Sequence, residues 1–185
     1  MRWPHTPRRA QRYGIALVPE DRKGQGLVLS LPAFANVTLT SPWSSARGPL
    51  LLPATERRAA RKVSGSVGFD DARLGATTRT LSGGNQQKLV LAKWIAREMP
   101  ILLVDEPTRG IDIGAKAEIF RTLHALADKG AAIVLVSSEL EEVVAHSDRI
   151  MVVARGVVVD TLDGAVATQQ EILERIFAVE EEEIA

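Results

Sequence analysis

Two short stretches of the chain hold the residue types that could do chemistry, and they follow each other closely. The first is Leu81–Lys88, which reads Leu-Ser-Gly-Gly-Asn-Gln-Gln-Lys. Ser82 is suited to cap the start of a helix, and Gly83 and Gly84 leave the backbone amides open to an approaching group. Such amides, at the positive end of a helix dipole, can bind an anion. An ordinary capped helix after a Gly-Gly turn would have the same pattern.

The second stretch is a short apolar run that ends in two adjacent carboxylates. Ile101–Val104 is typical of a buried parallel strand, and Asp105, Glu106 and Pro107 follow it. Ligands of open α/β sheets bind at the carboxyl ends of strands. There an aspartate can hold Mg²⁺ through water, and a glutamate can position or deprotonate a water. Two solvated acids at a strand end are the alternative.

The elements that must position these groups alternate between strands and helices, which predicts a parallel sheet in an α/β fold. Strands are predicted at residues 14–18, 101–104 and 131–136, with a hairpin at 149–154 and 156–161. Helices are predicted at residues 33–39, 55–67, 110–129, 139–145 and 168–177. Thr55 is expected to cap the second of them. Residues 1–12 and 41–53 are expected to be irregular.

The helix after Ser82 is expected to turn one apolar stripe toward the core. The stripe consists of Leu89, Ala92, Ala96 and Met99, which recur at helical spacing.

The composition excludes several classes of function. Lys plus Arg and Asp plus Glu each number 23, so the net charge is zero, which argues against a general electrostatic footprint for nucleic acid. Cysteine is absent, which excludes disulfides, thiolate metal sites and a cysteine nucleophile. No apolar run approaches the roughly 20 residues that a transmembrane helix needs.

Taken together, the motifs resemble those of ABC-type ATPases. Leu81–Lys88 is similar to the signature loop of that family, and Ile101–Pro107 to its Walker B strand with the following glutamate. Thr108–Asp112 resembles the loop that comes next.

The residues of these motifs are more similar still to one branch of the family, the second (C-terminal) ATPase half of bacterial monosaccharide importers of the ribose, galactose and xylose type. That resemblance is carried by Asn85–Lys88, Thr108–Gly110 and Val136–Glu139, and it runs from about Gly14 to about Phe177.

The resemblance implies roles for residues of both stretches. Asp105 would bind Mg²⁺ through water, and Glu106 would be the catalytic residue that acts on the attacking water. The signature loop would contact the ATP of an opposing half, through Ser82, Gly83, Gly84, Asn85 and Gln86.

Three further positions are implied to lie near the nucleotide. Asp112 suits the start of a helix, where negative charge is favourable, and by resemblance also lies in the loop that contacts the opposite half. Glu20 stands where the family has a glutamine that touches Mg²⁺ and the attacking water; a plain charged loop residue is the alternative. Ser138 stands where most ABC ATPases have a histidine that contacts the γ-phosphate, and serine cannot become a cation near pH 7.

The phosphate-cradling loop of these enzymes, Gly-x-x-x-x-Gly-Lys-Ser/Thr, is absent from the sequence. We therefore expect an ABC-type P-loop NTPase fold, with a parallel sheet core and a helical subdomain, that is incomplete at the N-terminus and lacks Walker A. Its sheet is expected to have an unpaired edge and an uncovered face. The expected single partial domain, residues 1–185, divides into a helical subdomain at about 26–98, an α/β core at about 14–20 and 99–178, and an acidic tail at 179–185.

The expected function is that of an ATP-binding and ATP-hydrolysing component of a sugar importer, with ATP and Mg²⁺ as cofactors. The expected partners are a second ATPase half, transmembrane permease subunits and, indirectly, a sugar-binding protein, with no nucleic acid, at the cytoplasmic face of the membrane. The alternative is a non-catalytic fragment or binding module that pairs with another ATPase half. A soluble ABC ATPase that acts on ribosomes or DNA is disfavoured by the net charge of zero and by the residues Asn-Gln-Gln-Lys at positions 85–88.

Overall fold

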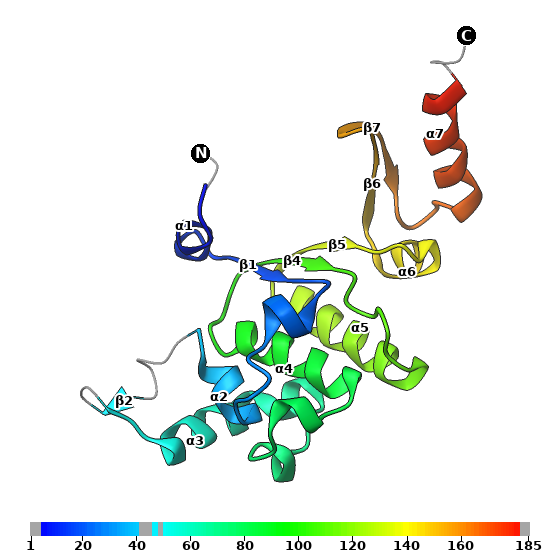
Figure 1. Cartoon of the computed structure of the whole chain (residues 1–185). Coiled ribbons are helices and arrows are strands. Elements are labelled where there is room, and N and C mark those ends of the chain that lie inside the picture. The colour runs from blue at the N-terminus through cyan, green and yellow to red at the C-terminus, as the bar shows by residue number, and fades with distance from the viewer. Residues whose placement is uncertain (1–4, 41–45, 48–49, 182–185) are drawn as a thin grey trace. The chain divides into compact units, whose positions relative to one another are not determined.

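The computed structural model describes residues 5–40, 46–47 and 50–181. The chain divides into two compact units, residues 1–134 and residues 135–185 (Figure 1). The sequence predicts a different division, between a helical subdomain and an α/β core, and those subdomain boundaries stay predictions.

The first unit holds the two stretches that could do chemistry. Its elements are α1 (Pro7–Arg12), β1 (Ile15–Val18), η1 (Arg22–Gly26), α2 (Ala33–Thr38), β2 (Ala46–Arg47), β3 (Leu50–Leu51), α3 (Pro53–Ser64), the one-turn helices η3 (Gly65–Val67), η4 (Asp71–Arg73) and η5 (Thr78–Thr80), α4 (Gly83–Ile95), β4 (Ile101–Asp105) and α5 (Ile113–Ala127). Strand β5 (Ala132–Val136) crosses the boundary between the units.

A sheet in the order β1-β4-β5 brings distant parts of the chain together. β1 and β4 run parallel, with Ile15 opposite Ile101 and Val18 opposite Val104, which confirms the parallel pairing predicted from the sequence. Because parallel strands end at the same edge of a sheet, the loop after Val18 and the loop after Asp105 leave the sheet side by side.

The two faces of this sheet differ in burial. Ala16, Val18 and Val104 are at most 1% exposed on the face that helix α4 covers (Figure 1). On the other face Leu17 is 48% exposed, and in β5 Val134 is 42% exposed. Strand β5 alternates between exposed and half-buried residues, so the prediction that residues 131–136 form a buried strand is wrong in its burial.

Helix α4 is buried on more sides than a single stripe predicts. Leu89, Val90, Leu91 and Ala92 are all at most 1% exposed. Since the helix ends at Ile95, the two last members of the expected stripe lie beyond its end.

Polar contacts anchor the C-terminal end of this helix. The ammonium group of Lys93 donates to the carbonyl of Gly26 (2.7 Å), and the indole of Trp94 donates to the carbonyl of Leu17 (2.8 Å). These bonds join α4 to η1 and to β1.

Three local predictions in the first unit are wrong. Residues 7–12 form a helix, because Thr6 caps it with its side chain and Pro7 occupies its first turn. Helix α3 begins at Pro53, so Thr55 lies in its first turn and donates its hydroxyl to the carbonyl of Leu52 (2.7 Å). The described part of residues 41–53 includes a short antiparallel pair, β2 with β3; residues 41–45 and 48–49 lie outside the description.

The second unit is a hairpin covered by helices. It contains α6 (Leu140–His146), β6 (Arg149–Ala154), β7 (Val157–Asp163) and α7 (Gln169–Glu181). The predicted hairpin turn at Arg155-Gly156 is confirmed, and both residues have positive φ. Buried Ile150, Leu162 and Ile172 form a core within this unit. Helix α7 continues past the predicted end at residue 177, and the acidic residues 182–185 lie outside the description.

Candidate functional site

Three segments meet at the carboxyl edge of β1 and β4: the loop after β1, the loop after β4, and the start of α4. A pocket of about 270 Å³ lies among them. It is lined by Arg22, Lys23, Leu29, Arg79, Leu81, Gly83, Gln86 and Gly110. Three of these residues are basic, so the pocket suits an anion such as a phosphate group.

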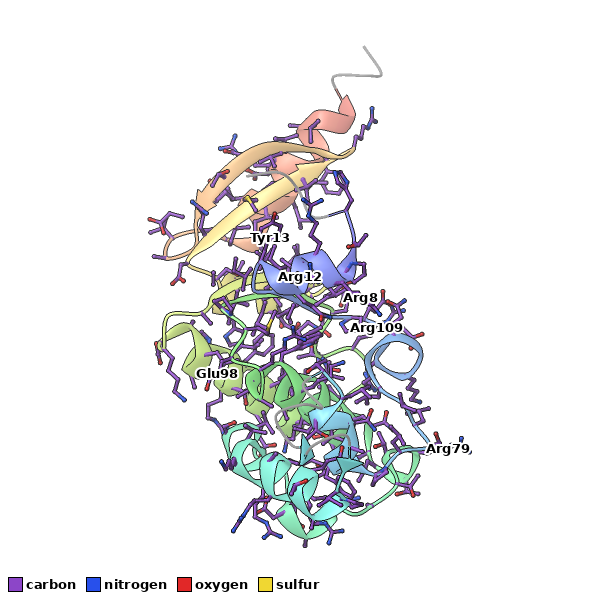
Figure 2. All side chains as sticks on the ribbon, turned by 90° about the vertical axis from the view of Figure 1, so that its left-hand side faces the viewer. Arg8, Arg12, Tyr13, Arg79, Glu98 and Arg109 are labelled. Atoms are coloured by element: carbon purple, nitrogen blue, oxygen red, sulfur yellow. The ribbon has the colours of Figure 1, made fainter. Side chains whose placement is uncertain are left out.

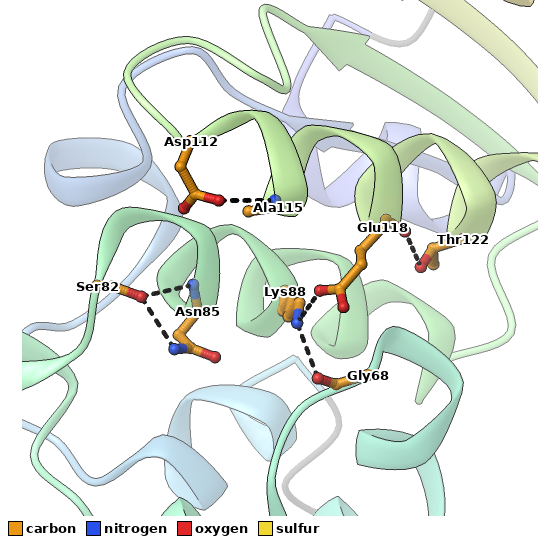
Figure 3. A network of polar contacts seen from close by, with 8 residues as sticks. All are labelled: Gly68, Ser82, Asn85, Lys88, Asp112, Ala115, Glu118 and Thr122. Carbon is orange, nitrogen blue, oxygen red and sulfur yellow. Dashed lines mark hydrogen bonds and ion pairs between the residues drawn. The ribbon is translucent and has the colours of Figure 1, made fainter.

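Ser82 caps helix α4 as predicted. Its hydroxyl oxygen accepts from the backbone amide of Asn85 (3.4 Å) and from the side-chain amide of Asn85 (2.9 Å) (Figure 3). Ser82 is exposed at this position. The predicted contact of both residues with nucleotide stays a prediction.

The two glycines of the signature loop both lie close to another segment, and the sequence did not reveal these contacts. A Cβ on Gly83 would lie 2.7 Å from Nη2 of Arg22 and 3.1 Å from the carbonyl oxygen of Gly110. A Cβ on Gly84 would lie 2.6 Å from the Cβ of Ala115 in α5. The Cβ of Ala115 cannot move aside, so the close approach of α5 explains glycine at position 84. At position 83 the flexible end of Arg22 can move, and the Gly110 carbonyl makes the space tight without excluding a Cβ.

Gln86 is buried under the start of its helix at 3% exposure. Its side-chain amide donates to the carbonyls of Thr78 and Leu81, both at 3.2 Å. Among the described residues no hydrogen-bond partner is found for its Oε1. Gln86 thus ties the signature loop to η5, while its predicted role toward nucleotide stays open to test.

The carboxylates at the end of β4 lie on a sharply turned backbone. Asp105 is the last residue of the strand, and Glu106, which follows it, has a φ of 45°. A left-handed conformation at a residue other than glycine costs of order 1–3 kcal/mol and is frequent at functional sites. The backbone amide of Arg109 donates to the carbonyl of Glu106 (3.3 Å), which closes this turn.

Asp112 caps helix α5, as the sequence predicts for a carboxylate at a helix start. Its Oδ1 accepts from the backbone amide of Ala115 (2.9 Å) (Figure 3). Its second predicted role, contact with an opposing half, is not tested by these contacts.

Lys88, the last residue of the signature loop, links three segments. Its ammonium donates to the carbonyl of Gly68 (2.8 Å) and pairs with the carboxylate of Glu118 in α5 (2.5 Å) (Figure 3). The Lys88 side chain is 10% exposed, so α4 and α5 are joined by a mostly buried cation.

Glu20 lies in the loop after β1, and its carboxylate forms an ion pair with Arg109 in the loop after β4. Arg22 donates from Nη1 to the backbone carbonyl of Arg109 (2.9 Å). Sequence reasoning missed Arg22 and Arg109 as site residues. The charged runs Pro-Glu-Asp-Arg-Lys and Pro-Thr-Arg-Gly, each directly after a predicted strand, were the signal that could have found them.

Ser138 belongs to the second unit and is described there by itself. It lies between β5 and α6. The hydroxyl of the preceding residue, Ser137, donates to the carboxylate of Glu142 (2.8 Å) and accepts from the backbone amide of Glu139 (3.1 Å). The structure does not place Ser138 relative to Asp105 and Glu106, so its predicted role stays a prediction.

The residues present fit a phosphate group better than a bare metal ion. The pocket supplies cations and the amides at the start of α4. In the described part of the chain, no group of three or more His, Cys, Asp or Glu side chains is placed to hold a metal. Asp105 could therefore hold Mg²⁺ only if waters and phosphate oxygens complete the coordination.

Among the described helices, none is both long and apolar enough to cross a membrane.

Comparison with known families identifies residues 5–109 as a match to the family model described as ABC transporter. The chain is 46% identical over 169 residues to ribose import ATP-binding protein RbsA 1 of Streptomyces avermitilis, covering 91% of this chain and 32% of that protein. It is also 46% identical over 170 residues to a putative ribose/galactose/methyl galactoside import ATP-binding protein of Burkholderia cenocepacia, covering 91% and 33%. The chain thus spans about a third of the length of these relatives.

Two solved structures show the fold. A dimeric ATP-binding cassette in a post-hydrolysis state bound to ADP and Pi matches with a TM-score of 0.68 at 22% identity, covering 84% of this chain and 66% of that one. The cbiO1 protein of Clostridium perfringens, part of an ABC transporter complex, matches with a TM-score of 0.71 at 20% identity, covering 95% and 68%. At these identities the likeness establishes the predicted α/β fold with a parallel sheet and helices.

Proposed function

Because the chain belongs to the ABC transporter family, we propose that it acts as the C-terminal ATPase half of a bacterial importer for monosaccharides such as ribose or galactose. In this proposal it supplies its signature loop to a nucleotide held by another ATPase half. The observation that carries the proposal is the capped, glycine-rich start of α4 beside a pocket lined by Arg22, Lys23 and Arg79.

In this proposal the residues at the start of α4 and at the end of β4 have separate roles in ATP binding and hydrolysis. ATP, when bound, supplies the phosphoanhydride bond whose hydrolysis drives transport. Ser82 and the amides at Gly83 and Gly84 would bind its terminal phosphate across the pairing surface. Asp105 would hold Mg²⁺ through water, and Glu106 would orient or deprotonate the attacking water.

The remaining assignments follow from the same proposal. Asn85, Gln86 and Asp112 would border the nucleotide of the opposing half, while Glu20 and Ser138 would replace the glutamine and histidine of other ABC ATPases. Permease subunits and, indirectly, a sugar-binding protein would be the partners, with the chain held at the cytoplasmic face of the membrane through the permease and no part played by nucleic acid.

The first experiment is calorimetry with Mg-ATP on the purified chain alone. We expect no binding at millimolar nucleotide, because the sequence holds no loop to cradle the α- and β-phosphates. Binding at micromolar nucleotide would contradict this view and would show that another segment holds the phosphates.

The second experiment adds a separate ATPase half that carries the phosphate-cradling loop. We expect ATP-dependent association that Ser82→Ala weakens and that Ser66→Ala, a matched exposed serine away from the signature loop, leaves unchanged. Glu106→Gln should slow hydrolysis in the pair without weakening association. Equal association with and without ATP would refute the proposal.

A second candidate function is favoured by the same missing loop. The chain would act as a binding module that pairs with an ATPase half without any hydrolysis of its own. Association that does not respond to ATP, together with unchanged hydrolysis in Glu106→Gln, would support this candidate.

A further inference from the structure

We infer that Glu20, Arg22 and Arg109 form a clasp that positions the start of α4 against the acidic end of β4. The inference goes beyond the proposed function by assigning positioning residues to the same site, and only their relevance to nucleotide rests on that proposal.

The clasp closes through two contacts between the loop after β1 and the loop after β4. The carboxylate of Glu20 pairs with the guanidinium of Arg109. The backbone carbonyl of Arg109 accepts from Nη1 of Arg22 (2.9 Å). The backbone amide of Arg22 also donates to the carbonyl of Glu20 (3.0 Å), so the side chains of Glu20 and Arg22 project from one tight turn. Arg109 is therefore held by its side chain and its backbone together.

The guanidinium of Arg22 reaches a third segment. Its Nη2 lies where a Cβ on Gly83 would be only 2.7 Å away, so the group packs directly against the first turn of α4. Among the described residues, no partner is found for its buried Nε. Burial lowers the pKa of Arg22, because desolvation disfavours the charged guanidinium, and the nearby carboxylate of Asp21 offsets part of this effect.

The backbone of the β4 loop is shaped to meet this cation. Gly110 has a φ of +68°, and its carbonyl oxygen would lie 3.1 Å from a Cβ on Gly83. The turn that contains Glu106 ends at Arg109, through the bond from the Arg109 amide to the Glu106 carbonyl (3.3 Å). A shift of Arg109 would therefore move the backbone of Glu106 as well as the contact with Gly83.

The two halves of the clasp differ in solvent access. The side chains of Glu20 and Arg109 are 44% and 67% exposed, so this ion pair is screened by water. Figure 2 shows Arg109 on the outside of the first unit, beside the coil of η1, with Arg79 farther along the same side. Arg22 supplies the less exposed half, and we expect it to dominate the positioning. In this arrangement Glu20 acts on the loop after β4 through Arg109.

The test is hydrogen–deuterium exchange on the full 185-residue chain without nucleotide. In Arg22→Met we expect the amides of residues 83–86 and 106–112 to exchange about tenfold faster, as for a local opening that becomes roughly 1.4 kcal/mol easier. Arg22→Lys should restore only part of the protection, since lysine lacks the planar fork that reaches both groups. Arg121→Met is the matched control, because Arg121 is exposed on α5 and does not line the pocket, and it should change neither segment.

The exposed half has its own test, which also serves if Arg22→Met fails to fold. Glu20→Arg should speed exchange at residues 106–112, and the charge-swapped pair Glu20→Arg with Arg109→Glu should reverse this change. A merely local role of Glu20 would give no such rescue. The clasp is refuted if Arg22→Met affects only residues 22–26, or if the charge swap restores nothing. Neither readout involves ATP, so failure of the proposed function would leave it standing.

Discussion

Gly84 provides the sharpest test of why the signature loop contains glycine. A Cβ on Gly84 would lie 2.6 Å from the Cβ of Ala115, whereas carbon atoms in contact prefer about 3.5–4.0 Å. The neighbouring atom belongs to a short side chain on α5 and cannot swing away. In Gly84→Ala, helices α4 and α5 must therefore move apart by roughly 1 Å.

The expected magnitude follows from two opposed effects. Overpacking of this kind costs about 1–3 kcal/mol. Alanine in place of glycine favours the helix by up to about 1 kcal/mol. We therefore expect Gly84→Ala to lower the free energy of unfolding by about 1–2 kcal/mol.

Gly65→Ala is the matched control, because the backbone of Gly65 is α-helical (φ −62°) and nothing lies within 4 Å of its added Cβ. It should stabilise the chain by about 0.4–1 kcal/mol. Urea unfolding followed by circular dichroism compares the two variants. If Gly84→Ala proved as stable as Gly65→Ala, the α4–α5 contact would not be what requires glycine at position 84, and the approach of a ligand would be the better explanation.

Two further predictions concern buried polar groups. Asn36 is 0% exposed, accepts from the amide of Val28 (2.8 Å) and donates to its carbonyl and to the hydroxyl of Thr78 (both 2.9 Å). Asn36→Ala should therefore lower the free energy of unfolding by about 2–4 kcal/mol, measured by urea unfolding. A loss below about 1 kcal/mol would contradict the view that these buried hydrogen bonds stabilise the fold. Burial lowers the pKa of Lys93 from 10.5 to about 8, so the unfolded chain binds the proton more tightly between these values. Stability should rise with pH from 8 to 10.5, by up to ~3 kcal/mol. Lys93→Met should lack this rise when unfolding is measured at pH 7.5 and pH 10, and an equal rise in both proteins would refute the assignment.

Local pattern in the sequence was enough to predict much of the fold. The apolar runs before Pro19 and Asp105 became parallel strands, and Ser82 and Asp112 became helix caps, since the backbone and nearest neighbours decide such features. The family resemblance was likewise carried by short motifs. The same local reasoning misplaced the cap of α3, because Pro53 at the first turn prevailed over Thr55.

Contacts between segments far apart in the chain were decided only by the tertiary structure. The sequence explained Gly83 and Gly84 by an approaching ligand, whereas the fold brings Arg22, Gly110 and Ala115 against them. It treated Glu20 as a candidate near a metal ion, whereas the sheet register sets it beside Arg109, 89 positions later in the chain. Residue types and spacing fix which groups can bind or react, but which groups meet depends on strand order and helix packing, and these depend on the burial of the whole core.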